Sequence, residues 1–189
     1  LGFLGVGRGN TVSKGPEWKQ AYIDYIMQLD GEQWQGYNLI YIDNDDIPEL
    51  VKIGNSEAVG CSIASYAEGK VQESQLSRLG FSYIERENLL CNSDGNMDHY
   101  YDVVYRLENG RLVQAAAGYY GAEDNSAVRY DENQEPVYQY QWNGAVMTRE
   151  EYNKALNAVY DTSRAKGGYT WNQWLSREEV IQAISAAGV

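Results

Sequence analysis

The sequence predicts an α+β fold, in which a tyrosine-rich antiparallel meander sheet carries one N-terminal helix and C-terminal helices packed on one side or end. The first observation is the order of patterns: one helix pattern, about eight short strand patterns, then two more helix patterns. The second is turn chemistry, since Asn109-Gly110 and Asn143-Gly144 are typical of turns between adjacent antiparallel strands. The third is composition, because the chain has 17 tyrosines and tyrosine favours half-exposed strands.

The first helix is predicted just after Pro16, since proline is common in the first turn of helices. Apolar residues recur three and four positions apart and would form its buried side: Trp18, Tyr22, Ile23, Ile26 and Leu29. Two C-terminal helices are predicted from capping boxes that begin at Thr148 and Ser176. We expect residues 16–189 to form a single α+β domain and the glycine-rich residues 1–15 to form an irregular N-terminal arm.

Between these helices, short segments rich in β-branched and aromatic residues predict the strands. They lie at residues 37–42, 49–53, 58–66, 70–76, 81–91, 97–107, 112–115, 137–142 and 145–147. The polar residues 92–96 are expected to form a turn, and the polar, acidic residues 121–135 a loop.

The chain is acidic, with a formal net charge of −12 at pH 7. Nucleic acids and anionic lipids are bound by basic surfaces, so we expect neither as a partner. The sequence has no run of about 20 apolar residues, so we expect no membrane insertion by this chain. The two cysteines, Cys61 and Cys91, form one disulfide if their strands are neighbours, or otherwise stay buried thiols.

The acidic segment between the first two predicted strands is the best candidate site. Asp43, Asp45 and Glu49 offer several oxygen ligands within a few residues, which is the chemistry that calcium prefers. Lys52 stands where the last ligand of an EF-hand would be, so only a shorter calcium loop fits. The alternative is a metal-free turn that the aspartates close through hydrogen bonds to the backbone.

Three segments carry a resemblance to a known group of proteins: EWKQAYIDYI at 17–26, YIDNDDIPEL at 41–50 and YQYQWNGAVMTREEY at 138–152. They resemble uncharacterised secreted or lipid-anchored proteins of Gram-positive anaerobes that carry a "DxDxDGxPEL"-like loop. The resemblance implies an extracellular or cell-surface protein whose signal or lipoprotein segment has been removed, and it is compatible with a lipid anchor upstream of this chain. It implies no reaction. Tyr41 and Asp46 depart from the pattern, since they replace its first aspartate and its turn glycine.

We therefore expect an uncharacterised extracellular or cell-envelope protein that acts as a non-catalytic binding domain for protein or glycan. One alternative is a hydrolase of cell-wall or dietary polymer that uses surface carboxylates, with Glu85 and Glu87 or Asp98 and Asp102 as the candidate pairs. Another is a calcium-stabilised structural module, with calcium as the one cofactor considered. The single histidine, His99, lacks a nucleophile motif beside it, so no catalytic residue is predicted.

Overall fold

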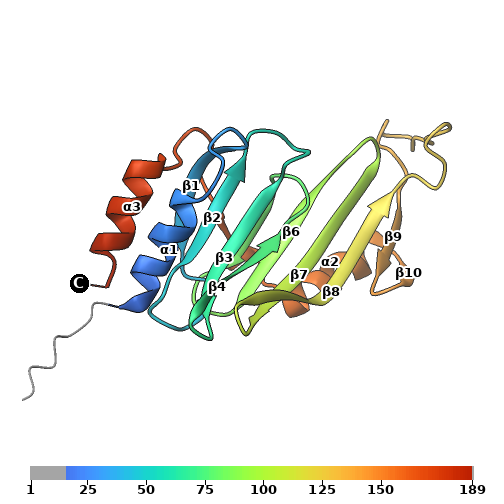
Figure 1. The fold of residues 1–189 in the computed structure, drawn as a ribbon. Helices are drawn as coiled ribbons and strands as arrows, with labels where there is room; N and C mark the ends of the chain where they lie inside the picture. Colours follow the sequence, from blue (N-terminus) through green and yellow to red (C-terminus); the bar gives the residue numbers. More distant parts are fainter. Residues whose placement is uncertain (1–15, 189) are drawn as a thin grey trace, which may run out of the picture.

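The computed structural model describes residues 16–188, so the predicted irregular arm at residues 1–15 lies outside the described residues. Figure 1 shows strands flanked by helices, and the predicted α+β class with one N-terminal helix and C-terminal helices is confirmed. In chain order the elements are α1 (Glu17–Met27), β1 (Trp34–Ile40), β2 (Glu49–Gly54), β3 (Cys61–Ala67), β4 (Lys70–Gln75), β5 (Phe81–Ile84), β6 (Leu89–Asn96), β7 (His99–Glu108), β8 (Arg111–Gly121), β9 (Gln139–Trp142), β10 (Ala145–Met147), α2 (Arg149–Val159), the 3-10 helix η1 (Thr162–Arg164), β11 (Lys166–Gly167) and α3 (Arg177–Ala186).

The strands form two antiparallel sheets. Sheet A has the order β1-β2-β3-β4, and sheet B has the order β10-β9-β8-β7-β6-β5-β11. Neighbouring strands follow one another in the chain, as the turn signals predicted, except that β11 returns after α2 to pair with β5. The meander arises because hairpin turns such as Asn109-Gly110 hold positive φ angles that favour tight antiparallel connections.

Helices α1 and α3 cover one face of sheet A. Their apolar side chains pack with Leu50 and Ala64 of the sheet in one cluster, which also contains Trp18, Tyr22, Ile26, Tyr37, Val180 and Ile184. All five residues predicted for the buried side of the first helix lie in or against this cluster, as the spacing indicated. The two C-terminal helices cover different sheets, because α2 packs on β8 and β9 of sheet B.

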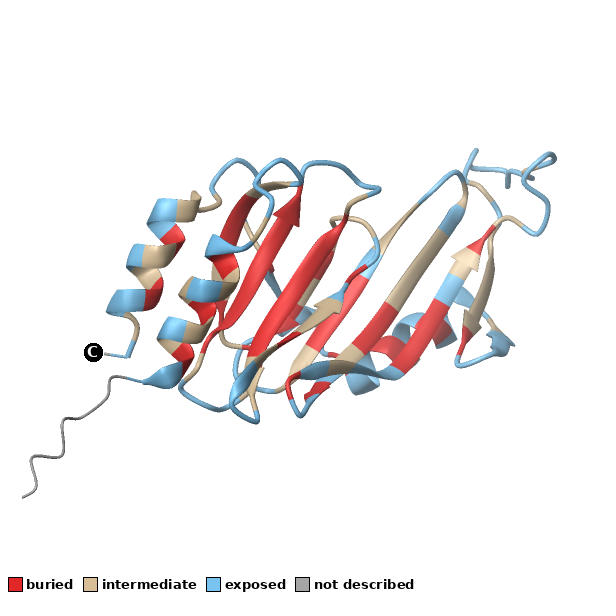
Figure 2. Cartoon of the chain, in the orientation of Figure 1, coloured by how far each residue is buried: buried red, intermediate tan, exposed pale blue. Residues whose placement is uncertain are grey.

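The opposite face of sheet A packs against sheet B. Alternate residues of neighbouring strands form this middle core, which contains Ile40, Ile42, Val51, Ile53, Cys61, Ile63, Leu76, Phe81, Tyr83, Leu90 and Leu107. Figure 2 shows the consequence, since β2 and β3 are buried along almost their whole length. In Figure 1, β7, β8 and β9 extend beyond sheet A, with α2 on the far side of them. No helix within residues 16–188 covers the front face of these three strands.

Two turns differ from the sequence prediction. The segment 81–91 is divided into β5 and β6 by a turn in which Arg86 and Asn88 have positive φ angles. The turn predicted at residues 92–96 is instead part of β6, and the chain reverses at Met97 and Asp98. Asn92 explains the error, since it is buried in the strand and its amide donates to two backbone carbonyls. A buried asparagine whose hydrogen bonds are all made within the fold cannot be distinguished from a turn asparagine by sequence alone.

Candidate functional site

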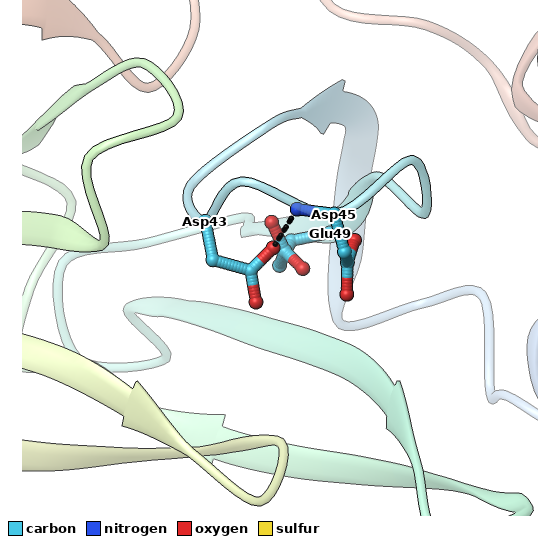
Figure 3. A group of neighbouring side chains, drawn as sticks. All are labelled: Asp43, Asp45 and Glu49. Atoms are coloured by element: carbon cyan, nitrogen blue, oxygen red, sulfur yellow. Dashed lines mark hydrogen bonds between the residues drawn. The ribbon is translucent and has the colours of Figure 1, made fainter.

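Three carboxylates converge between β1 and β2. Asp43 and Asp45 lie in the connecting loop, and Glu49 is the first residue of β2. One carboxylate oxygen of each lies within 4.8 Å of those of the other two, and Figure 3 shows the three side chains gathered at one point of the loop. The structure therefore brings together all three predicted metal residues, and no other such group occurs among residues 16–188.

The two aspartates also build the loop. Asp43 Oδ1 accepts a hydrogen bond from the backbone N–H of Asp45 at 3.2 Å, and Asp45 Oδ1 accepts one from that of Ile47 at 2.8 Å. Both bonds reach two residues ahead, which is the geometry of an Asx turn. The second oxygen of each aspartate makes no hydrogen bond with any described residue. The loop thus has the metal-free turn that the sequence left as one alternative, and the same aspartates keep an oxygen that could bind a metal ion.

Glu49 fixes the buried end of the cluster. Its side chain is 1% exposed, its Oε2 accepts from the backbone N–H of Ile42 at 2.8 Å, and its Oε1 accepts from Ser65 Oγ at 3.3 Å. Next to it, the Tyr22 hydroxyl of α1 donates to the carbonyl of Pro48 at 2.7 Å. The helix and the sheet therefore hold this carboxylate in one position.

The cluster is electrostatically strained in the absence of a cation. Burial, helped by the charges of Asp43 and Asp45, raises the pKa of the Glu49 carboxyl to about 8, although its hydrogen bonds act in the opposite direction. Burial and the neighbouring Asp43 carboxylate also raise the pKa of Asp45. A divalent cation between these oxygens would relieve the repulsion and favour ionised carboxylates. The described arrangement can hold a metal ion with oxygen ligands.

Tyr41 and Asp46, the two positions that depart from the DxDxDGxPEL-like pattern, make contacts outside the cluster. The Tyr41 ring lies under the guanidinium of Arg86, 4.4 Å from ring centroid to Cζ. Asp46 is 98% exposed, and its carboxylate lies 3.6 Å from Arg86. Arg86 also donates to the carbonyl of Asp45 at 3.0 Å. Sequence reasoning missed this residue because it comes from the distant β5–β6 turn.

The carboxylates considered for a hydrolase are all engaged by other side chains. Glu85 pairs with Lys166 at 2.5 Å, Glu87 with Arg164, Asp98 accepts from the Tyr138 hydroxyl, and Asp102 accepts from the Tyr152 and Ser93 hydroxyls. The ion pairs lower the pKa of both glutamates. His99 is exposed and its Nε2 lies 2.6 Å from Asn125 Nδ2. These contacts are surface ion pairs and hydrogen bonds that stabilise sheet B.

Both cysteines are free and buried. Cys61 lies in the core between the sheets, whereas Cys91 lies in the cluster under α2. The sequence left a disulfide and two buried thiols as alternatives, and the structure shows two buried thiols. Burial raises the pKa of each thiol to about 12.

The tyrosines of β7, β8 and β9 divide between the two faces of sheet B. Tyr100, Tyr120 and Tyr140 are cross-strand partners and therefore share one face. Their rings stack at 5.3 Å and 5.1 Å between centroids, and Tyr152 of α2 meets Tyr120 and Tyr140 edge-on. These half-buried rings support the packing of α2.

The opposite face carries Tyr101 and Tyr119, which pair with each other across β7 and β8, while Gln141 of β9 pairs with Tyr119. Tyr119 is 52% exposed, and no aromatic ring among the described residues packs against it. A hollow of about 290 Å³ opens beside it. Its polar and aromatic lining includes His99, Tyr101, Tyr119, Glu123, Gln139 and Gln141.

Sequence reasoning noted the tyrosine excess but missed this hollow. The signal was present in the alternation of β9, where Gln139 and Gln141 flank Tyr140, but only the strand register assigns the two glutamines to the face of Tyr119. The positions of Tyr119 and Tyr120 on opposite faces follow from the period of a strand.

Comparison with known proteins finds no matching family model, no similar curated protein and no similar solved structure. None of the helices within residues 16–188 combines the length and the apolar character that crossing a membrane requires.

Proposed function

We propose that the protein is a non-catalytic binding domain of an extracellular or cell-envelope protein, and that its ligand, a glycan or a protein, binds the face of β7–β9 around Tyr119. The observation that carries this proposal is the exposed Tyr119 ring beside a hollow with a polar and aromatic lining. Rings that are apolar on the face and polar at the tip are favoured at binding surfaces. The tyrosines on the opposite face contact α2, which gives them a structural role.

The extracellular part of the proposal is supported by the loop resemblance and by the acidic composition. Cell fractionation with an antibody against the protein tests it directly. We expect the protein in the envelope or medium fraction, and recovery only with cytoplasmic markers would contradict this localisation.

The binding part is tested with a glycan array and a pull-down from envelope extract, using the wild-type protein, Tyr119→Ala and Tyr130→Ala. Tyr130 is a matched control, because it is a tyrosine with 63% exposure that lies outside the hollow. We expect the wild type and Tyr130→Ala to retain a ligand that Tyr119→Ala loses. Two empty experiments would contradict the binding function, and equal retention by all three proteins would place the ligand elsewhere.

We propose a second role for the loop between β1 and β2, as a weak calcium site that stabilises the fold. It is supported by the convergence of the Asp43, Asp45 and Glu49 oxygens, of which the last is fully buried. For a dissociation constant near 0.1 mM, millimolar calcium would add about 1.5 kcal/mol. A protein of this size would then melt about 3–6 °C higher. Equal melting temperatures in EDTA and in calcium would contradict the site, with magnesium as the control cation.

A further inference from the structure

The ligand chemistry can be read from the side chains that line the hollow beside Tyr119. The amides of Gln139 and Gln141 lie on the same face of β9, two residues apart. Neither side chain forms a hydrogen bond with another residue in the part of the chain that the structure describes. Each amide both donates and accepts, so the pair matches a ligand whose groups also do both.

Four tyrosines line the hollow. Tyr100 and Tyr120 stack on each other, and their rings belong to the opposite face of the sheet. On the face of the hollow, the Tyr101 ring is fixed and the Tyr119 ring is free. The Tyr101 hydroxyl donates to Ser77 Oγ at 2.9 Å, which ties this ring to the β4–β5 connection. Tyr119 has no such bond among residues 16–188 and is half exposed. Its ring face is therefore available for the apolar C–H face of a ligand, while the amides meet the polar edge.

The lining is almost without charge. Glu123 is its single carboxylate, and it contains no lysine or arginine. The whole chain carries a formal charge of −12, so an anionic ligand would be repelled at long range and would find no cation in the hollow. A cationic ligand would find one carboxylate only. The charge distribution favours an uncharged ligand.

The size of the hollow favours a small group. At about 290 Å³ it lies at the lower limit of small-molecule sites, about 300 Å³. A stable protein partner usually covers about 800 Å² of each surface, which a single hollow of this kind does not provide. Gly121, which also lines the hollow, lies directly against the β6–β7 turn, since a Cβ at this position would be 2.0 Å from the Asp98 carbonyl oxygen. A single ring of a longer chain fits this shape.

We propose that the hollow binds one ring of an uncharged saccharide, with its C–H face on Tyr119 and its hydroxyl groups bonded to the amides of Gln139 and Gln141. Hydroxyl groups donate and accept, as these two amides do, and a pyranose ring has an apolar face and a polar edge. This inference rests on the proposed binding function and names the ligand class for the same surface.

Affinity electrophoresis in gels that contain one polymer each provides the test. The polymers are neutral glucan, mannan and xylan, and polygalacturonate as the acidic counterpart. We expect retardation by at least one neutral polymer, with affinity about tenfold lower in Tyr119→Ala and also reduced in Gln141→Ala. Tyr130→Ala should match the wild type, and Tyr119→Phe should keep most of the affinity because the ring remains. Added salt should have little effect, since no ion pair is formed.

The possible outcomes distinguish a wrong ligand class from a wrong binding function. Retardation by polygalacturonate alone, or binding that salt abolishes, overturns the neutral saccharide. Capture of envelope protein without any polysaccharide binding overturns it as well but leaves the binding function intact. If the protein binds no polymer and captures no envelope protein, both the saccharide proposal and the binding function are contradicted. Far-UV circular dichroism of each variant, compared with Tyr130→Ala, distinguishes loss of the ligand from loss of the fold.

Discussion

Replacing Glu49 by glutamine tests the electrostatic description of the acidic loop. The Glu49 carboxyl has an ordinary pKa of 4.5, and burial with the neighbouring aspartates raises it to about 8 in the folded protein. The folded state therefore binds more protons than the unfolded state between these two values. The associated stability is complete below the unfolded pKa and is lost as the pH rises through the folded pKa. Glu49→Gln removes this dependence because an amide does not titrate.

The magnitude follows from the pKa difference. From 4.5 to pH 7 is 2.5 pH units, and at about 1.36 kcal/mol per unit the wild type without calcium loses on the order of 3 kcal/mol. Solvent does not screen this difference appreciably, because the Glu49 side chain is 1% exposed. The amide keeps the acceptor for the Ile42 N–H but leaves a buried donor, which costs about 1 kcal/mol. Glu49→Gln should therefore be about 2 kcal/mol more stable at pH 7.

The assay is thermal and urea unfolding in EDTA, from about pH 5 to about pH 8.5. We expect the wild type to lose stability across this range, and Glu49→Gln to melt about 4–8 °C above it at pH 7. Glu132→Gln is the control for removing one negative charge, because Glu132 is an exposed loop residue far from the cluster in sequence. In millimolar calcium the difference should shrink, since calcium stabilises the wild type and the variant lacks one carboxylate ligand.

Two results would refute this reasoning. If the stability of the wild type in EDTA does not fall between about pH 5 and about pH 8.5, the carboxyl does not carry the raised pKa. If Glu49→Gln is less stable than the wild type at pH 7 without calcium, the hydrogen bonds of the carboxylate outweigh its burial.

Three further predictions concern packing and reactivity. Gly36→Ala should destabilise the protein by about 2 kcal/mol in urea unfolding, because its Cβ would lie 1.9 Å from the Trp174 ring. A neutral result would mean that the ring moves aside freely. Cys61 and Cys91 should react with a thiol reagent only after denaturant is added, since burial raises the pKa of both to about 12. Thr148→Ala should cost about 1 kcal/mol by circular-dichroism melts, because it removes the capping box of α2.

The helices and hairpins were predictable because their signals are local. Thr148 and Ser176 begin α2 and α3 with the capping boxes that the sequence indicates. Asn109-Gly110 and Asn143-Gly144 have positive φ angles in the turns where the sequence predicted them. Each of these features depends on four or fewer neighbouring residues, so no knowledge of the tertiary structure was needed.

The division of the strands into two sheets was not predictable from such signals. It depends on which face of β6 packs on sheet A and which on α2, with Leu90 in one core and Cys91 in the other. Both residues are apolar and adjacent, so the sequence predicts a strand that is buried on both faces. It does not indicate which face packs on sheet A and which on α2. The position of Arg86 over Tyr41 likewise depends on a contact between distant segments.

The acidic cluster was predictable because its three carboxylates are close in sequence, but the turn interpretation and the metal-site interpretation were treated as alternatives. The structure shows why the two interpretations are compatible. An aspartate has two oxygens: in Asp43 and Asp45, Oδ1 closes a turn, and the other oxygen makes no hydrogen bond within residues 16–188. A turn role therefore does not remove the residue from a metal site.

The tyrosines also divide between two uses, which explains why composition could not locate the proposed binding surface. Tyr119 and Tyr120 are neighbours of identical type, yet they face opposite sides of sheet B. Tyr120 contacts Tyr100 and Tyr140 of the sheet, Tyr138 just before β9 and Tyr152 of α2, so its ring is used for packing. Tyr119 has no such contact among the described residues and lines a hollow with unpaired amides. A function that depends on tyrosine is therefore decided by which rings the fold leaves unoccupied, and not by how many tyrosines the chain contains.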